Sequence, residues 1–177
     1  KRGARKGARG RELPSTGSNS LHNAVLLTNN YIIDNHIKDN MFATLFFGLL
    51  DPSTGNVSYI NAGHNPPHIL DAEGNVKASL NPSGPAVGMF PGVDFNIEYA
   101  QIDPGDTIYA YTDGVTEARN SSGDFLTDDG LFQILQGPIN SATGLLDRIE
   151  STLADFMLDA EKLDDITMMA IHRSAEG

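Results

Sequence analysis

Acidic side chains occur at two points of the sequence where an apolar strand is predicted to meet a turn. Asp113 follows the apolar segment that ends at Tyr111, and Gly114 lets the backbone turn sharply behind it. Asp164 and Asp165 come immediately before the last apolar segment. Carboxylates held together at a sheet edge repel each other unless they share a cation, and hard cations prefer oxygen ligands. The two points predict a metal site; the plainer alternative is that each aspartate only caps a turn.

A loop rich in turn-forming residues, NAGHNPP (61–67), is a third candidate because it contains Gly63, His64 and Asn65. Imidazole is the side chain best suited to proton transfer near neutral pH, so His64 is a candidate general acid. The glycine and prolines around it favour the other interpretation, in which His64 orients the loop. The other histidines show no spacing typical of metal ligands and are interpreted as incidental: His22, His36, His68 and His172.

Composition removes several classes of function. The 177 residues include no cysteine, which excludes a disulfide scaffold, a Cys-ligated metal centre and a Cys nucleophile. The net charge is −11, although six of the twelve basic residues lie in residues 1–11. The remaining body is strongly acidic and repels phosphate backbones. The longest apolar run, residues 41–50, is about half a membrane span. We therefore expect a cytoplasmic protein that binds neither nucleic acid nor membrane.

Periodicity and turn residues predict a mixed architecture of antiparallel hairpins with helices packed on a sheet, which is the α+β class. Residues 1–20 are expected to form a basic flexible leader and residues 21–177 the folded domain. The first helix is predicted over 21–37 with Ser20 as its cap, and the later helices over 127–135 and 144–158. The predicted strands are 42–50, 57–61, 68–70, 94–102, 106–112 and 166–172. The last of them, composed of β-branched and Met residues, is expected to be buried. Strand 42–50 is almost continuously apolar, which favours burial on both faces and pairing with 57–61 through the turn DPSTGN.

Three ordered segments resemble one protein family: TLFFGLLDPSTGNVSYINAGHNPPHIL (44–70), IDPGDTIYAYTDGVTEARN (102–120) and LDDIT (163–167). They are similar to the PPM-type metal-dependent protein serine/threonine phosphatases, above all the bacterial stage II sporulation E branch. The resemblance extends over about residues 21–173. It implies a sandwich of two antiparallel sheets flanked by helices.

The resemblance also implies the chemistry. In the family a carboxylate cluster binds two Mn²⁺ or Mg²⁺ ions, which activate a water for attack on the phosphate. Asp113 matches the Asp-Gly metal ligand, Asp164 opens the last acidic motif, and Asp165 takes the place beside it. Asp113 and Asp164 are therefore the expected catalytic residues. Gly63, His64, Asn65 and Gly114 are expected to bind substrate or orient loops.

One part of the family pattern has no counterpart here. The first metal motif of the family, an Asp-Gly turn with the bridging aspartate, precedes the first predicted helix, whereas Asp34 and Asp39 lack a glycine turn. The chain thus resembles the C-terminal two-thirds of a phosphatase domain that acts on a phosphorylated bacterial regulatory protein, such as an anti-anti-sigma factor. An upstream sensor or receiver domain is an expected partner. The alternatives are a catalytically inactive interaction module of the same fold and a metal-free acidic domain.

Overall fold

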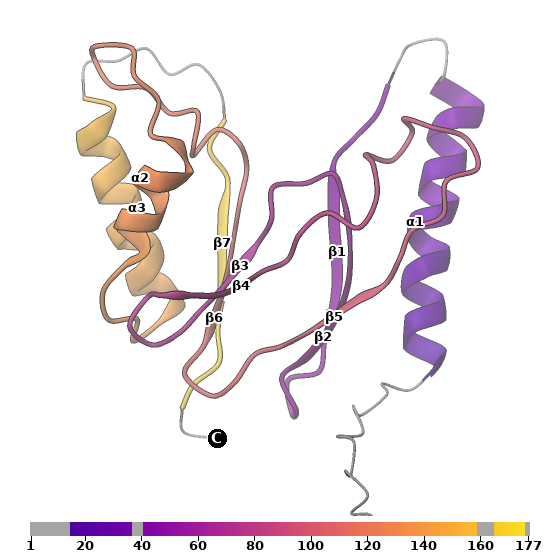
Figure 1. Ribbon diagram of the computed structural model, residues 1–177, viewed down its shortest axis with the longest axis horizontal. Coiled ribbons are helices and arrows are strands. Elements are labelled where there is room, and N and C mark those ends of the chain that lie inside the picture. The colour runs from indigo at the N-terminus through magenta and orange to yellow at the C-terminus, as the bar shows by residue number, and fades with distance from the viewer. Residues whose placement is uncertain (1–14, 37–40, 159–164, 176–177) are drawn as a thin grey trace, which may run out of the picture.

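The computed structural model describes residues 15–36, 41–158 and 165–175, which form four layers (Figure 1). A helix covers one antiparallel sheet, a second antiparallel sheet faces the first, and two helices cover the outer side of the second sheet. The helices are α1 (Ser15–His36), α2 (Thr127–Leu135) and α3 (Ala142–Phe156). The strands are β1 (Leu45–Leu50), β2 (Asn56–Ala62), β3 (His68–Leu70), β4 (Val76–Ser79), β5 (Glu98–Gln101), β6 (Thr107–Tyr111) and β7 (Met168–His172).

The first sheet has the strand order β1-β2-β5. Strands β1 and β2 pair in register from Leu45 opposite Ala62 to Leu50 opposite Val57, which confirms the predicted hairpin. Gly55 ends the connecting turn with φ +79°, a conformation that favours glycine. Helix α1 packs on the outer face of this sheet through a small apolar core: Leu21, Val25, Ile60, Ala62, Val87 and Phe95.

The second sheet has the order β4-β3-β6-β7, and every neighbouring pair in it is antiparallel. Its outer face packs against α2 and α3, whose buried leucines and isoleucine contact Tyr109 and Tyr111 of β6. Ser141 begins α3 by accepting a hydrogen bond from the Gly144 amide. The two sheets meet over a third apolar core: Val57, Tyr59, Ile69, Leu80, Ile102 and Ile108. This arrangement confirms the predicted α+β class.

The predicted burial of residues 42–50 is wrong. In the part of the chain that the structure describes, β1 is an edge strand paired only with β2, and the exposed fractions of Phe42, Phe47 and Leu49 are 56%, 37% and 40%. Within the described ranges the last strand, predicted to be buried, is also an edge strand, with Met169 49% exposed. An apolar run indicates what a strand can bury, whereas burial itself depends on whether another element covers it.

Helix α1 begins earlier than predicted. Residues 15–20, assigned to the leader, are helical, so Ser20 lies inside the helix and does not cap it. Residues 1–14 lie outside the described residues. Helix α2 has the predicted bounds, and α3 begins and ends two residues before the predicted positions. No helix among the described residues has the length and apolar character needed to cross a membrane.

Candidate metal site

The three segments singled out in the sequence lie toward the same end of the second sheet. Strand β6 ends at Tyr111, whereas its antiparallel neighbours β3 and β7 begin at His68 and Met168. The residues that follow β6 therefore lie at the same end of the sheet as those that precede β3 and β7. In Figure 1 this is the upper end of the sheet, and the C-terminus marks the opposite end.

Asp113 sits in a hydrogen-bonded turn, residues 112–117, which we call the Asp113 turn. The Gly114 amide donates to Asp113 Oδ1 at 3.0 Å, and the Glu117 amide donates to the Asp113 carbonyl at 2.8 Å. The side chain of Asp113 is exposed. Its other carboxylate oxygen accepts no hydrogen bond from the described residues, so that oxygen is available to a cation.

The Asp113 turn packs directly against the last acidic segment. The Thr112 amide donates to the Thr167 carbonyl at 3.0 Å, and the Thr112 hydroxyl donates to the Asp165 carbonyl at 3.3 Å. A Cβ atom on Gly114 would lie 2.4 Å from the Asp165 carbonyl oxygen, so only glycine permits this approach. Asp113 and Asp165 are thus brought together although 52 positions separate them in the sequence.

The donors at this end fit a hard divalent cation in kind, since they are exposed carboxylates of Asp113 and Asp165. The number of these carboxylate donors is small. Across the described ranges, no group of three or more acidic or histidine side chains lies close enough to hold a metal ion. Asp164 lies outside the described residues, and the expected approach of its carboxylate to within about 6 Å of Asp113 stays a prediction.

The loop 61–67 is organised by a buried asparagine. Asn61 accepts a hydrogen bond from the His64 amide at 2.8 Å and donates to the Leu80 carbonyl at 2.9 Å. Gly63 has φ +73°, and a Cβ there would lie 3.0 Å from the Ala86 nitrogen. His64 Nδ1 lies 2.8 Å from the Asn65 carbonyl oxygen. Because a carbonyl only accepts, Nδ1 carries a proton, and Nε2 of the neutral ring is left as an acceptor. A role as general acid would need the imidazolium form.

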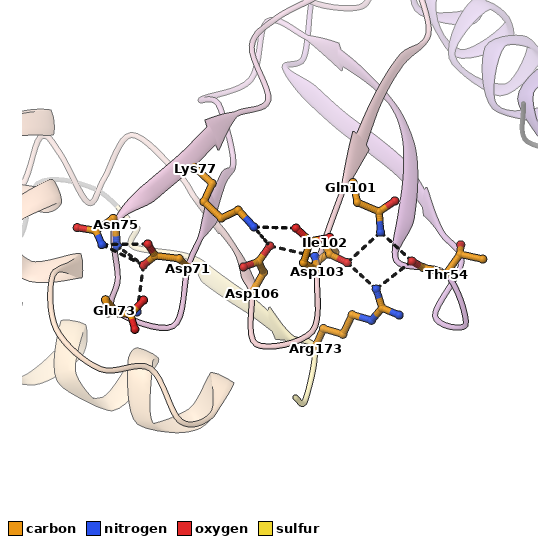
Figure 2. Close-up of polar contacts among 10 residues, drawn as sticks. All are labelled: Thr54, Asp71, Glu73, Asn75, Lys77, Gln101, Ile102, Asp103, Asp106 and Arg173. Atoms are coloured by element: carbon orange, nitrogen blue, oxygen red, sulfur yellow. Dashed lines mark hydrogen bonds and ion pairs between the residues drawn. The ribbon is translucent and has the colours of Figure 1, made fainter. Parts of the chain in front are cut away.

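A second acidic group lies at the opposite end of the sheet, and Lys77 is paired with both of its carboxylates (Figure 2). Lys77 Nζ lies 2.6 Å from Asp106 Oδ2 and 2.9 Å from Asp103 Oδ2. These two hydrogen-bonded carboxylates raise the pKa of Lys77. Beside them Arg173 donates to the Ile102 and Thr54 carbonyls. The group holds chain segments together, and each of its two carboxylates already forms an ion pair with Lys77.

Sequence reasoning missed a polar arrangement behind the Asp113 turn. His68, interpreted as incidental, is only 3% exposed, and its Nε2 lies 3.4 Å from the Tyr111 hydroxyl. That hydroxyl donates in turn to Asp128 Oδ1 at 3.3 Å. The apolar residues that follow His68 in β3 were a signal for burial. Nothing in the sequence linked it to Asp128, which lies 60 positions away.

Burial lowers the pKa of His68 below its usual value, and this predicts a pH effect on stability. Below about pH 6.5 the unfolded chain takes up a proton that the folded chain does not, so stability falls as the pH drops toward the folded pKa. Chemical denaturation of the wild type and His68→Gln at pH 7.5 and 5.5 should show a smaller loss of stability in the variant. Equal losses of stability in the wild type and His68→Gln would contradict the burial of His68.

Comparison with known proteins identifies the family. The sequence matches the family described as stage II sporulation protein E (SpoIIE) over residues 8–174, which is almost the whole chain. The chain belongs to the SpoIIE family of PP2C-type phosphatase domains. The resemblance inferred from the three segments is thereby confirmed. The SpoIIE phosphatase domain from Bacillus subtilis, in a structure presoaked with Mn, matches 98% of this chain and 81% of that chain at a TM-score of 0.63 and 16% identity. This likeness confirms the fold.

Two relatives of the SpoIIE-family chain extend the comparison. Protein IcfG from Synechocystis sp. strain PCC 6803 is 47% identical over 152 residues, which are 86% of this chain and 24% of IcfG. The phosphoserine phosphatase RsbU from Bacillus subtilis is 27% identical over 163 residues, which are 91% of this chain and 47% of RsbU. The chain therefore spans less than half the length of each relative.

Proposed function

We propose that this SpoIIE-family chain forms part of a metal-dependent phosphatase that removes phosphate from serine or threonine of a bacterial regulatory protein. The observation that carries the proposal is the packing of the Asp113 turn, whose Asp113 side chain is exposed, on the Asp165 backbone, which gathers oxygen donors at one open end of a sheet. RsbU, named a phosphoserine phosphatase, supports the reaction type. An upstream sensor or receiver domain that controls the activity belongs to the same proposal.

In this proposal Asp113, Asp165 and Asp164 hold Mn²⁺ or Mg²⁺. The bound ions would supply an activated water and neutralise charge on the phosphate. Gly114 lets the two acidic segments approach, and the Asp113 Oδ1 hydrogen bond to its own turn fixes the direction of the carboxylate. The loop with Gly63, His64 and Asn65 lies at the same end of the sheet, where it would orient the phosphorylated substrate. His64 Nε2 would accept a proton or hydrogen bond there.

A second candidate function is a phosphatase fold that binds a regulatory protein without catalysis. Two observations favour it: no group of three or more acidic or histidine side chains among the described residues is placed to hold a metal ion, and β1 leaves apolar side chains exposed at a sheet edge. The proposed partner is the same kind of phosphoprotein, so activity is the property that distinguishes the two.

The 177-residue chain is expected to hydrolyse p-nitrophenyl phosphate or a phosphoserine peptide slowly or not at all, even in millimolar Mn²⁺. Two divalent ions about 3.5–4 Å apart repel strongly, and few carboxylates offset that repulsion here. A chain extended at its N-terminus by a segment with the family's Asp-Gly motif is expected to gain Mn²⁺-dependent turnover. Turnover is measured by phosphate release, with Mn²⁺ binding measured separately by calorimetry.

Three results are distinguishable. Turnover of the extended chain that disappears in Asp113→Asn supports the phosphatase. An extended chain that binds Mn²⁺ but remains inert favours the interaction module. Equal turnover by the short and extended chains would contradict the requirement for a further carboxylate motif.

A further inference from the structure

Four polar side chains form a hydrogen-bonded line through the protein behind the Asp113 turn. Ser79 Oγ of β4 lies 3.0 Å from His68 Nδ1 of β3, and His68 Nε2 lies 3.4 Å from the Tyr111 hydroxyl of β6. The Tyr111 hydroxyl donates to Asp128 Oδ1 at the start of α2, at 3.3 Å. We call this line the polar chain. It connects three strands of the second sheet to the helix that covers them.

The hydrogen-bond chemistry gives the polar chain one direction. Because an ionised carboxylate only accepts, the Tyr111 hydroxyl donates its one proton to Asp128. The Tyr111 oxygen must then accept a hydrogen bond from His68 Nε2–H. His68 Nδ1 is then the lone-pair nitrogen and accepts from the Ser79 hydroxyl. Burial lowers the pKa of His68, and burial together with Asp128 raises the pKa of Tyr111, so both rings are neutral at neutral pH.

The surroundings hold the two rings in place. The rings of His68 and Tyr111 stack at a centroid distance of 5.8 Å, and Phe132 of α2 meets the His68 ring edge-on at 5.1 Å. Tyr111 and His68 are both buried. A polar group in such a site is costly unless its hydrogen bonds are made, so the partners of these two rings are strongly specified.

The polar chain ends where the Asp113 turn is attached to α2. Tyr111 is two residues from Asp113, and Asp128 is next to Thr127, whose amide donates to the Thr116 carbonyl of the turn at 2.9 Å. The Leu126 amide donates to the Ala118 carbonyl, also at 2.9 Å. Thr127 has φ +64°, a strained conformation for a β-branched residue, which persists only where neighbouring contacts enforce it. The contact between Tyr111 and Asp128 is one such constraint.

We propose that the polar chain, with Tyr111 and His68 as positioning residues, holds the start of α2 against the Asp113 turn and so sets the position of the Asp113 carboxylate. The proposal rests on the proposed function only for the statement that the Asp113 carboxylate binds a metal ion. The mechanical link between α2 and the turn stands on the hydrogen bonds alone.

Two pairs of nearby residues provide matched variants: Tyr109 with Tyr111, and Asp128 with Asp129. Tyr109 and Tyr111 are both buried and stack on each other at 5.5 Å, yet the Tyr109 hydroxyl has no hydrogen-bond partner among the described residues. Tyr111→Phe therefore removes a link of the polar chain, whereas Tyr109→Phe removes only an unpaired hydroxyl. Likewise, Asp128→Ala removes the acceptor, Asp128→Asn keeps an acceptor oxygen, and Asp129→Ala is the control for charge in the same helical turn.

The test combines amide hydrogen exchange with ¹⁵N NMR of His68 on the 177-residue chain. We expect the Glu117 and Thr127 amides to exchange at least about tenfold faster in Tyr111→Phe and Asp128→Ala, relative to Ile60 of β2 as an internal reference, because a hydrogen bond to a charged group is lost. Tyr109→Phe and Asp129→Ala should leave both amides unchanged, and Asp128→Asn should restore most of the protection. The ¹⁵N shifts should show the Nε2–H tautomer of His68.

An Nδ1–H tautomer, or equal acceleration in Tyr109→Phe and Tyr111→Phe, would overturn the proposal. The Mn²⁺ affinity of the same variants is measured in parallel. A fall is expected in Tyr111→Phe and Asp128→Ala, and none in Tyr109→Phe or Asp129→Ala. A wild-type chain that bound no Mn²⁺ would contradict the proposed function, whereas the exchange and tautomer results would still decide whether the polar chain holds the turn.

Discussion

Asp113→Asn is expected to weaken Mn²⁺ binding by at least about tenfold while leaving the fold intact. Loss of even an outer partner of a metal site typically costs about tenfold to a hundredfold in affinity, and here a charged donor itself is removed. The asparagine Oδ1 can still accept the Gly114 amide, so the turn keeps its hydrogen bond. The free energy of unfolding should therefore change by no more than about 0.5 kcal/mol.

The control for Asp113→Asn is Asp147→Asn on α3, where an exposed aspartate makes the same change in net charge. Calorimetric titration with Mn²⁺ measures both variants. Equal weakening by the two would mean that Mn²⁺ responds only to the overall negative charge of the chain, and the assignment of Asp113 as a ligand would be wrong.

Gly114→Ala is expected to lower the free energy of unfolding by about 1–3 kcal/mol, the usual cost of forcing an extra methyl group into a packed site. The added Cβ would lie 2.4 Å from the Asp165 carbonyl oxygen and 3.1 Å from its carbonyl carbon. Both are backbone atoms, so a side-chain rotation cannot relieve the clash. The Asp113 turn and the Asp165 segment must move apart, which should also weaken Mn²⁺ binding.

Gly48→Ala in β1 is the matched control, because a Cβ there would approach other residues no closer than 3.4 Å. Urea denaturation should show little change for Gly48→Ala and a clear loss for Gly114→Ala. Similar stabilities for the two variants would mean that the turn and the last acidic segment are not packed as described.

Local chemistry made several elements of this fold predictable. The turn DPSTGN between two apolar runs specified the β1–β2 hairpin, and the pattern of α2 gave its bounds. The Asp-Gly dipeptide after an apolar strand marked the Asp113 turn and its exposed carboxylate. Each of these signals lies within a few residues of the element it predicts.

Features that depend on distant neighbours were not predictable in the same way. The apolar character of β1 does not reveal that the strand lies at a sheet edge, because burial depends on elements elsewhere in the chain. The contact of Gly114 with Asp165 follows from the pairing of β6 with β7, and the link from His68 to Asp128 follows from the packing of α2 on β3 and β6. Helix α1 likewise extends back through residues 15–20, whose serine-rich sequence favours a cap or turn over a helix interior.

We propose that a divalent cation binds at the end of the sheet where the Asp113 turn meets Asp165. Paramagnetic broadening of amide signals by substoichiometric Mn²⁺ locates the ion directly. We expect the signals of Asp113, Gly114 and Asp165 to broaden first and Asp113→Asn to remove this broadening. Broadening centred on Asp103 and Asp106 at the opposite end, or spread evenly over the acidic surface, would contradict it.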